Sequence, residues 1–258
     1  MSILKSLCSA FLMYSRIPVP RVKWSEENRR FSLVFFPLVG AVTGGLLVLW
    51  RMAVDYLGIN SLLFSAVACV IPIIVSGGIH LDGFCDVIDA QGSCAPKEKK
   101  LEIMSDPHIG SFAAIGLAVY FILQFGLFSC VNSFRAVSVV ALGYSLSRTL
   151  SALCAITFKS AKNDGSLQSF VKPADKLTSI ILLSVFLASV FAGMLLIDLI
   201  AGAAALALSA AALVFFRFFS YKSFGGITGD LAGFFLQICE IVVLLGAAAT
   251  EIYRQIGI

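Results

Sequence analysis

A short stretch of this chain, residues 77–112, gathers six carboxylates and both histidines: GGIHLDGFCDVIDAQGSCAPKEKKLEIMSDPHIGSF. Within it, Asp82, Asp86 and Asp89 follow one another at intervals of four and three residues. On a helix this spacing points three carboxylates to one face, where like charges repel and some protons are retained. A divalent cation relieves that repulsion, and clustered oxygen ligands suit magnesium or manganese bridged to substrate phosphates. The spacing therefore predicts a metal site for phosphate chemistry.

Apolar residues alternate with these acids, namely Leu81, Phe84, Val87 and Ile88. A helix with one acidic and one apolar face is expected to lie against a bundle with its acids turned towards a cavity. Gly83 lowers helix propensity by about 1 kcal/mol, so a helix here needs close packing or a ligand at that position. The alternative is an acidic, solvated cytoplasmic loop.

A second polar stretch, GGITGDLAGFFLQICE, covers residues 225–240. Gly225, Gly226 and Gly229 lack Cβ atoms, so their backbone amides could approach a phosphate closely, with Asp230 near the start of the last apolar run. The stretch has no Gly-Lys-Ser/Thr sequence and is therefore not a Walker motif. A plain helix–helix turn remains the alternative.

The two histidines, His80 and His108, could serve as ligands or acid–base groups, while a hydrogen-bonding role in a polar loop explains His108 equally well. The chain contains no HExxH sequence and no locally supported Ser/His/Asp arrangement, which disfavours zinc hydrolysis and acyl transfer. Its seven cysteines form no CxxC pair, and most lie in or beside apolar runs, where cysteine acts as a small hydrophobic residue.

The elements that carry these residues are apolar. Of the 258 residues 59% are hydrophobic and 13% are charged, against about 45–50% and about 25% in soluble domains. Runs of about 20 apolar residues suit membrane-spanning helices. Seven such runs are predicted, at residues 31–54, 61–79, 112–131, 134–158, 177–198, 199–219 and 231–250, with a weak break at Asp198. We expect an all-α integral membrane protein, one bundle and one domain over residues 1–258.

The N-terminal stretch MSILKSLCSAFLMYSRIPVP is predicted to form an uncleaved interfacial or re-entrant helix. A secretory signal is disfavoured because Arg16, Pro18 and Pro20 stand where small cleavage-site residues should be. With the N-terminus inside, fifteen of the nineteen Lys and Arg residues fall on the cytoplasmic side. The net charge of +4 then reflects topology and an anionic leaflet, not nucleic-acid binding.

Two charges fall near the middle of the predicted spans. Arg148 and Glu240 each lie ten residues from the cytoplasmic end of a span, or about 15 Å deep. A lone charge there costs roughly 2.5–3.5 kcal/mol, so each is expected to face a partner or a water-filled cavity. We hypothesise that they pair at the floor of the active-site cavity, with Gln237 one turn above. The alternative is that each faces the cavity separately and Arg148 binds substrate phosphate.

Five stretches together resemble the adenosylcobinamide-GDP ribazoletransferase family: SRIPVP, FFPLVGAVTGG, GGIHLDGFCDVIDA, LEIMSDPHIGSF and GGITGD. They stand in the family's order across nearly the whole chain. The resemblance implies a magnesium-dependent transferase of the bacterial inner membrane, with its active site on the cytoplasmic side. Such an enzyme joins adenosylcobinamide-GDP to α-ribazole or α-ribazole 5′-phosphate, giving adenosylcobalamin or its 5′-phosphate and GMP, late in cobalamin biosynthesis.

The resemblance also implies residue roles. Asp82 and Asp86 would be metal ligands, Asp89 a ligand or base, and His80 a catalytic group, with Glu102 as a further candidate. Substrate would be bound by Arg16, Gly225, Gly226, Thr228, Gly229 and Asp230, and Asp106 is a further candidate. Arg148 and Glu240 are substrate-binding candidates because of their depth in the spans, independently of the resemblance. The chain departs from the family pattern at Ala90, where Gly is common, at Pro107-His108 in place of Ser-Arg, and at Gln237 in place of an acid.

Two other functions compete with this interpretation. A CDP-alcohol phosphotransferase also uses spaced aspartates around magnesium, but its pattern needs DGxxAR, and DGFCDVIDA supplies no Ala-Arg. A membrane transporter would use intramembrane charges such as Arg148, Asp198 and Glu240 as an ion path, yet would not need three acids on one loop face. The sequence leaves the oligomeric state open.

Overall fold

The computed structural model describes residues 2–162 and 167–257, which form helices and no strand. The expected all-α architecture is therefore confirmed over this part of the chain. The helices are α1 (Ser2–Tyr14), α2 (Glu26–Arg29), α3 (Ser32–Leu57), α4 (Ser61–Ser76), α5 (Ile79–Gly92), α6 (Lys97–Ile103), α7 (Ser111–Cys130), α8 (Phe134–Thr157), α9 (Gln168–Val171), α10 (Lys176–Ile197), α11 (Leu199–Phe224) and α12 (Gly229–Ile256).

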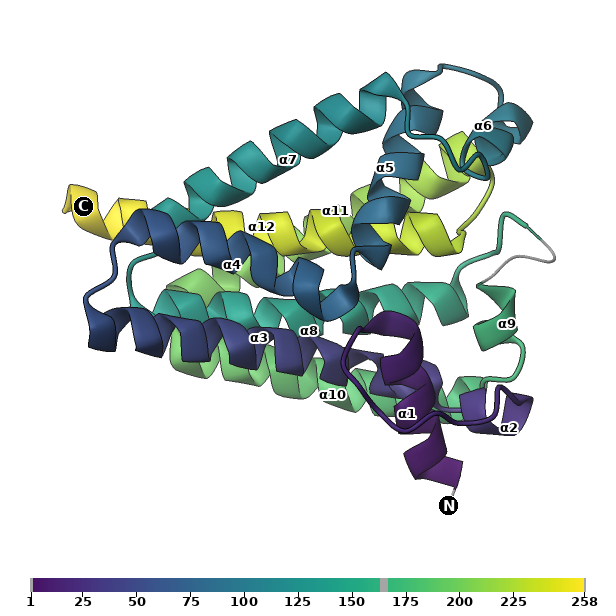
Figure 1. The fold of residues 1–258 in the computed structure, drawn as a ribbon, viewed down its shortest axis with the longest axis horizontal. Coiled ribbons are helices and arrows are strands. Elements are labelled where there is room, and N and C mark those ends of the chain that lie inside the picture. The colour runs from purple at the N-terminus through teal and green to yellow at the C-terminus, as the bar shows by residue number, and fades with distance from the viewer. Residues whose placement is uncertain (1, 163–166, 258) are drawn as a thin grey trace.

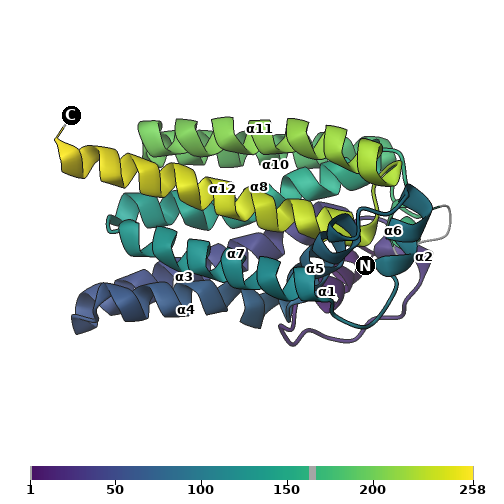
Figure 2. The same ribbon diagram turned by 90° about the horizontal axis from the view of Figure 1, so that it is seen from above.

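Six of these helices, α3, α7, α8, α10, α11 and α12, are long and apolar enough to cross a membrane. They run alongside one another down the long axis of the molecule (Figures 1 and 2). The central helix is α8, whose most apolar window is 89% buried, whereas the corresponding window of α10 is only 17% buried. The exposed surface of α10 is apolar, and its backbone polar groups are hydrogen-bonded within the helix. Both properties are what contact with lipid requires.

The second predicted span is shorter than expected. Instead of continuing to residue 79, α4 ends at Ser76, and α5 starts at Ile79 with a bend of 97° between the two axes. Gly77 and Gly78 make this corner in the left-handed region, with φ of 67° and 82°. As Figure 1 shows, α5 consequently lies across one end of the bundle instead of along it.

The short helices gather at that same end. Figure 1 shows α1, α2, α6 and α9 at the same end of the molecule as α5, while the C-terminus lies at the opposite end. The apolar N-terminal helix expected from the sequence is present as α1, and it is not collinear with the long helices. The break at Asp198 is confirmed, because its carboxylate accepts a hydrogen bond from the Ala201 amide and caps α11.

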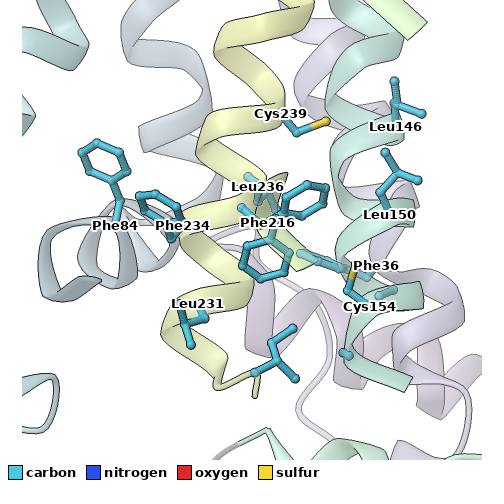
Figure 3. Packing of buried hydrophobic residues seen from close by; sticks show 14 of the residues in the cluster. Phe36, Phe84, Leu146, Leu150, Cys154, Phe216, Leu231, Phe234, Leu236 and Cys239 are labelled. Carbon is cyan, nitrogen blue, oxygen red and sulfur yellow. The ribbon is translucent and has the colours of Figure 1, made fainter. Parts of the chain in front are cut away.

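Aromatic contacts fix α5 and α11 against α12. The rings of Phe84 and Phe234 stack with centroids 5.6 Å apart, and those of Phe216 and Phe235 with centroids 4.8 Å apart. Figure 3 shows Phe84, Phe234 and Phe216 around the start of α12. These rings bury the apolar face of α5 against the bundle, so its acidic face is left pointing away.

Candidate active site

The amphipathic helix expected around the acidic stretch is confirmed as α5. Phe84 and Val87 are buried, whereas Asp82 is exposed and Asp86 is half-buried. The carboxylates therefore line the open side of a helix whose other side is anchored in the core.

The absence of a side chain at Gly83 allows Asp230 of α12 to lie beside the carboxylates of α5. A Cβ atom at this position would lie 2.8 Å from the Cα atom of Asp230, so the two backbones are in direct contact. The glycine that weakens the helix is thus required by close packing of α5 on α12. This contact brings Asp230, at the start of α12, next to the acidic face of α5.

The charges of these acids act on one another. Partial burial, and then the charges of Asp82, Asp230 and Asp89, raise the pKa of Asp86 to about 7. Since an ordinary aspartate titrates far lower, Asp86 keeps part of its proton at neutral pH, which reflects burial and repulsion among the carboxylates. A bound cation would relieve that repulsion.

Asp89 has a different environment from its neighbours. Its Oδ2 accepts a hydrogen bond from the Gly110 amide at 2.6 Å and its Oδ1 accepts one from the Ala113 amide at 2.8 Å. Both oxygens therefore cap the first turn of α7. Each oxygen has one amide donor and keeps a further lone pair, so the role of Asp89 as metal ligand or base stays a prediction.

Three cavities meet at Asp82. The inner cavity, of about 120 Å³, is lined by Asp82, His80, Gly229, Asp230 and apolar side chains. The arginine cavity, of about 560 Å³, joins Asp82 to Arg16 and to the Gly77–Gly78 corner. The outer cavity, of about 290 Å³, joins Asp82 and Asp86 to Asp106 and His108. Of the predicted site residues, Asp82 alone lines all three of them.

The histidines occupy unlike positions. His80 is buried, and this burial holds its pKa well below the usual range, so the imidazole is neutral. His108 is exposed, and it donates from its backbone amide to Asp106 Oδ1 at 3.0 Å, with its Nδ1 2.7 Å from the same oxygen. Glu102 is exposed and pairs with Lys99, away from these cavities.

The glycine-rich turn, residues 225–230, connects α11 to α12, and most of its contacts are structural. Gly225 ends α11 with φ of 80°, and a Cβ at Gly226 would lie 2.8 Å from the Ala161 amide nitrogen. The Thr228 hydroxyl accepts a hydrogen bond from the Leu231 amide at 3.2 Å and caps α12. Of the predicted phosphate-binding group, Gly229 and Asp230 reach the inner cavity; direct contact of the other three residues with substrate stays a prediction.

Some residues at the site gave no signal in the sequence. Tyr14 and Ser151 line the inner cavity from α1 and α8. The Lys162 ammonium donates to Ser105 Oγ at 2.8 Å and acts electrostatically on Asp230. These residues lie far apart along the chain and have no spacing in common, so only the fold assembles them.

A metal site is not fully formed within the described part of the chain, where no three His, Cys, Asp or Glu side chains are arranged to hold an ion. The donor chemistry nevertheless fits magnesium. Asp82 and Asp86 offer carboxylate oxygens at the edge of an open cavity, and magnesium is usually held by one or two carboxylates together with waters and substrate phosphates.

The predicted pairing of Arg148 with Glu240 is confirmed. Arg148 Nη1 donates to Glu240 Oε1, and it also donates to the Tyr144 carbonyl at 2.9 Å and to Ser147 Oγ at 3.1 Å. Both side chains are buried between α8 and α12. One turn nearer the start of α12, Gln237 accepts a hydrogen bond from the Tyr120 hydroxyl at 2.6 Å.

The position of this pair differs from the expected cavity floor. Arg148 and Glu240 line none of the three cavities that meet at Asp82. Each borders a void of only about 10 Å³, enough for about one water molecule. Their contact with substrate stays a prediction, and their observed contact is with each other.

Comparison with known proteins gives matches over nearly the whole chain. The family model described as cobalamin-5-phosphate synthase matches residues 6–248. An adenosylcobinamide-GDP ribazoletransferase of Lachnoclostridium phytofermentans is 40% identical over 96% of this chain and 95% of its own length. Proteins with that name from Clostridium botulinum (strain Alaska E43) and Treponema denticola are 34% and 31% identical. The first covers 95% of this chain and 98% of its own length, and the second 93% and 96%.

No solved structure matches the chain. The sequence matches extend over nearly all of the chain and include the acidic helix, the glycine-rich turn and the apolar helices that hold them. The chain is therefore an enzyme and belongs to the cobalamin-5-phosphate synthase family.

Proposed function

We propose that this chain joins adenosylcobinamide-GDP to α-ribazole or α-ribazole 5′-phosphate, releasing GMP and forming adenosylcobalamin or its 5′-phosphate. A hydroxyl oxygen of the ribose forms a bond to the phosphorus on the cobinamide side of the pyrophosphate. The bond from that phosphorus to the bridging oxygen breaks, and GMP leaves with the electron pair. The relatives' names support the two substrate classes.

The observation that carries this proposal is the position of Asp82 where three cavities meet. A reaction between two substrates needs a site reached from two directions, with charge-stabilising groups where they meet. The arginine cavity is larger than the inner cavity, and the guanidinium of Arg16 in its wall can bind the pyrophosphate, so we assign the pyrophosphate to it. The inner cavity suits the ribazole.

Asp82 and Asp86 are the residues that would hold magnesium, consistent with their open side on α5. When bound, the ion neutralises charge on the phosphate oxygens, which is the main requirement of phosphoryl-type transfer. We assign the proton acceptor to Asp230, because it lines the inner cavity together with Asp82. Its carboxylate accepts a long hydrogen bond from the Thr228 hydroxyl, at 3.5 Å, and keeps lone pairs that can accept the ribose hydroxyl proton.

We further propose that the end of the bundle carrying α5 faces the cytoplasm of a bacterial inner membrane. The support is the excess of Lys and Arg at that end, which the positive-inside rule assigns to the cytoplasm.

Product analysis tests the proposed reaction. Purified protein in lipid vesicles is incubated with adenosylcobinamide-GDP and α-ribazole, with magnesium or with a chelator. The expected result is equimolar GMP and adenosylcobalamin, formed only when both substrates and magnesium are present. Transfer from a CDP-alcohol under the same conditions, with no GMP from adenosylcobinamide-GDP, would instead support the phosphotransferase alternative.

A further inference from the structure

His80, which lines the inner cavity, has a buried ring nitrogen that lacks a hydrogen-bond partner among the described residues. His80 is only 5% exposed, and among the described residues its Nε2 has no hydrogen-bond partner. Its ring lies 5.5 Å from that of Phe36 and 6.5 Å from that of Tyr14, measured between centroids. Because buried polar atoms are nearly always hydrogen-bonded, an unpaired one in a cavity wall points to a ligand that completes it.

The rest of the cavity wall is mostly apolar. Beside the two aromatic rings it consists of Met13, Leu33, Ile79, Ala152, Ala155, Leu167, Ala232 and the small polar Ser151, with Asp82 and Asp230 as its acids. Its volume of about 120 Å³ is somewhat below the roughly 150 Å³ of an engineered protein cavity that binds benzene, so it encloses about one six-membered ring, and a larger base would extend from its open side. The cavity therefore has the lining and the scale of a site for an aromatic ring with one polar atom.

We propose that the inner cavity binds the base of the ribazole substrate and that His80 Nε2–H donates a hydrogen bond to the free ring nitrogen of that base. This inference rests on the proposed function, which supplies the substrate. The base of ribazole is a dimethylated benzimidazole, with an apolar carbocycle and one ring nitrogen not bonded to ribose. One acceptor on the ligand thus matches one unpaired donor in the wall.

The bases of the other substrate fit this cavity less well. Guanine and adenine carry several donors and acceptors on their edges, and an apolar wall with one histidine would leave most of them unpaired. A benzimidazole has no donors or acceptors on its carbocycle, so an apolar wall leaves none of them unpaired. Asp82 and Asp230 line the same cavity as His80 and Phe36, so a ribose attached to a base bound there would lie near the carboxylates that the proposed reaction needs.

Two acceptors of the same shape test the hydrogen bond. One is α-ribazole, and the other is the matching riboside of 5,6-dimethylindole, in which a C–H group replaces the free nitrogen. In wild-type protein kcat/KM, followed by GMP release, should favour ribazole by about tenfold. In His80→Phe, which keeps an aromatic ring, the preference should fall close to one, while the KM for adenosylcobinamide-GDP stays unchanged. A merely structural role of His80 would lower both rates and leave their ratio intact.

The cavity itself is tested by filling it. Ala155→Leu should raise the KM for both acceptors at least about tenfold, because the added carbons occupy the space of the ring. Ala192→Leu is the matched control, since Ala192 is exposed on the lipid-facing helix α10, and it should leave both KM values unchanged. If Ala155→Leu does not give folded protein, Ala155→Val makes the same test with a smaller side chain.

Equilibrium dialysis of labelled α-ribazole against the same purified proteins separates this inference from the proposed function. Binding to wild type that is lost in Ala155→Leu supports the cavity assignment even if no GMP is formed, in which case the proposed reaction fails alone. An undiminished ribazole preference in His80→Phe, or unchanged ribazole binding and KM in folded Ala155→Leu, would overturn the inference while leaving the reaction in place.

Discussion

Arg148 is the largest of the fully buried side chains in the described part of the chain, and its charge lies in the middle of the bundle. Its guanidinium is held by Glu240 and by two oxygens of α8. Taking one member away from such a pair leaves the other charge buried and uncompensated, which typically costs about 3–5 kcal/mol. We infer that the pair fixes α12 against α8, and that it thereby fixes the position of Asp230 at the start of α12.

A double-mutant cycle measures this coupling. Arg148→Gln and Glu240→Gln should each destabilise the purified protein by about 3–5 kcal/mol, whereas the double variant should lose much less than the sum, because it buries no unpaired charge. Unfolding in detergent, followed by loss of helical circular dichroism, gives the three free energies. Strictly additive losses would contradict the pairing.

The contacts of Arg148 and of Asp89 differ in how far the sequence predicts them. The pairing of Arg148 with Glu240 was predictable, because equal depth in the membrane follows from counting residues along two spans. The capping of α7 by Asp89 was not, because Gly110 lies 21 residues further on and only the fold brings its amide to the carboxylate. Spacing alone made Asp89 look equivalent to Asp82 and Asp86.

At the scale of elements, the corner between α4 and α5 decides the shape of the site. Hydropathy extends the second span to residue 79, because Ile79 is apolar and glycine is neutral to such a scale. The left-handed backbone of Gly77 and Gly78 ends the helix earlier and turns α5 by 97°. The six long helices were predictable from apolar length, whereas the direction of α5 depends on two backbone conformations that hydropathy does not encode.

A Gly83→Ala substitution tests whether α5 is seated by backbone contact. Alanine favours a helix by about 1 kcal/mol over glycine, but here its Cβ would lie 2.8 Å from the Asp230 Cα atom. We expect a net destabilisation of about 1–3 kcal/mol, as for overpacking, together with at least about a tenfold loss of GMP release. Thermal unfolding and turnover of the same sample check both.

Gly126→Ala is the control for this prediction. Gly126 lies in α7, is exposed, and has nothing within 4 Å of its would-be Cβ. Alanine there should leave turnover unchanged and should not destabilise the protein. If Gly83→Ala behaved like this control, the close contact between α5 and α12 would not matter to the site.

For the whole molecule, the distribution of charge gives a testable orientation. By their positions along the elements, fifteen Lys and Arg residues belong to the end that carries α5, whereas Arg51, Arg135 and Arg254 belong to the other. At that other end Arg254 donates to Asp198 at 2.7 and 2.8 Å, so part of its charge is already paired.

Cysteine labelling in intact cells checks this orientation. In a background with Cys94 replaced by serine, since that cysteine is exposed, single cysteines near Lys99 and Lys222 should be protected from an impermeant reagent. Cysteines near Asn60 and Asn132, at the opposite end, should react. The reversed pattern would place the candidate site outside the cytoplasm.

The central claim is that the open carboxylates of α5 carry the transfer reaction, and Asp82→Asn tests it most directly. The substitution keeps the shape of the side chain and removes a ligand charge at the point where the three cavities meet. In vesicles containing equal amounts of inserted protein, GMP release should fall to background in Asp82→Asn and in Asp86→Asn. Asp89→Asn should keep measurable activity, because its single amide oxygen can still accept one of the two hydrogen bonds from the start of α7. Near-normal GMP release by Asp82→Asn at ordinary magnesium concentration would contradict the account.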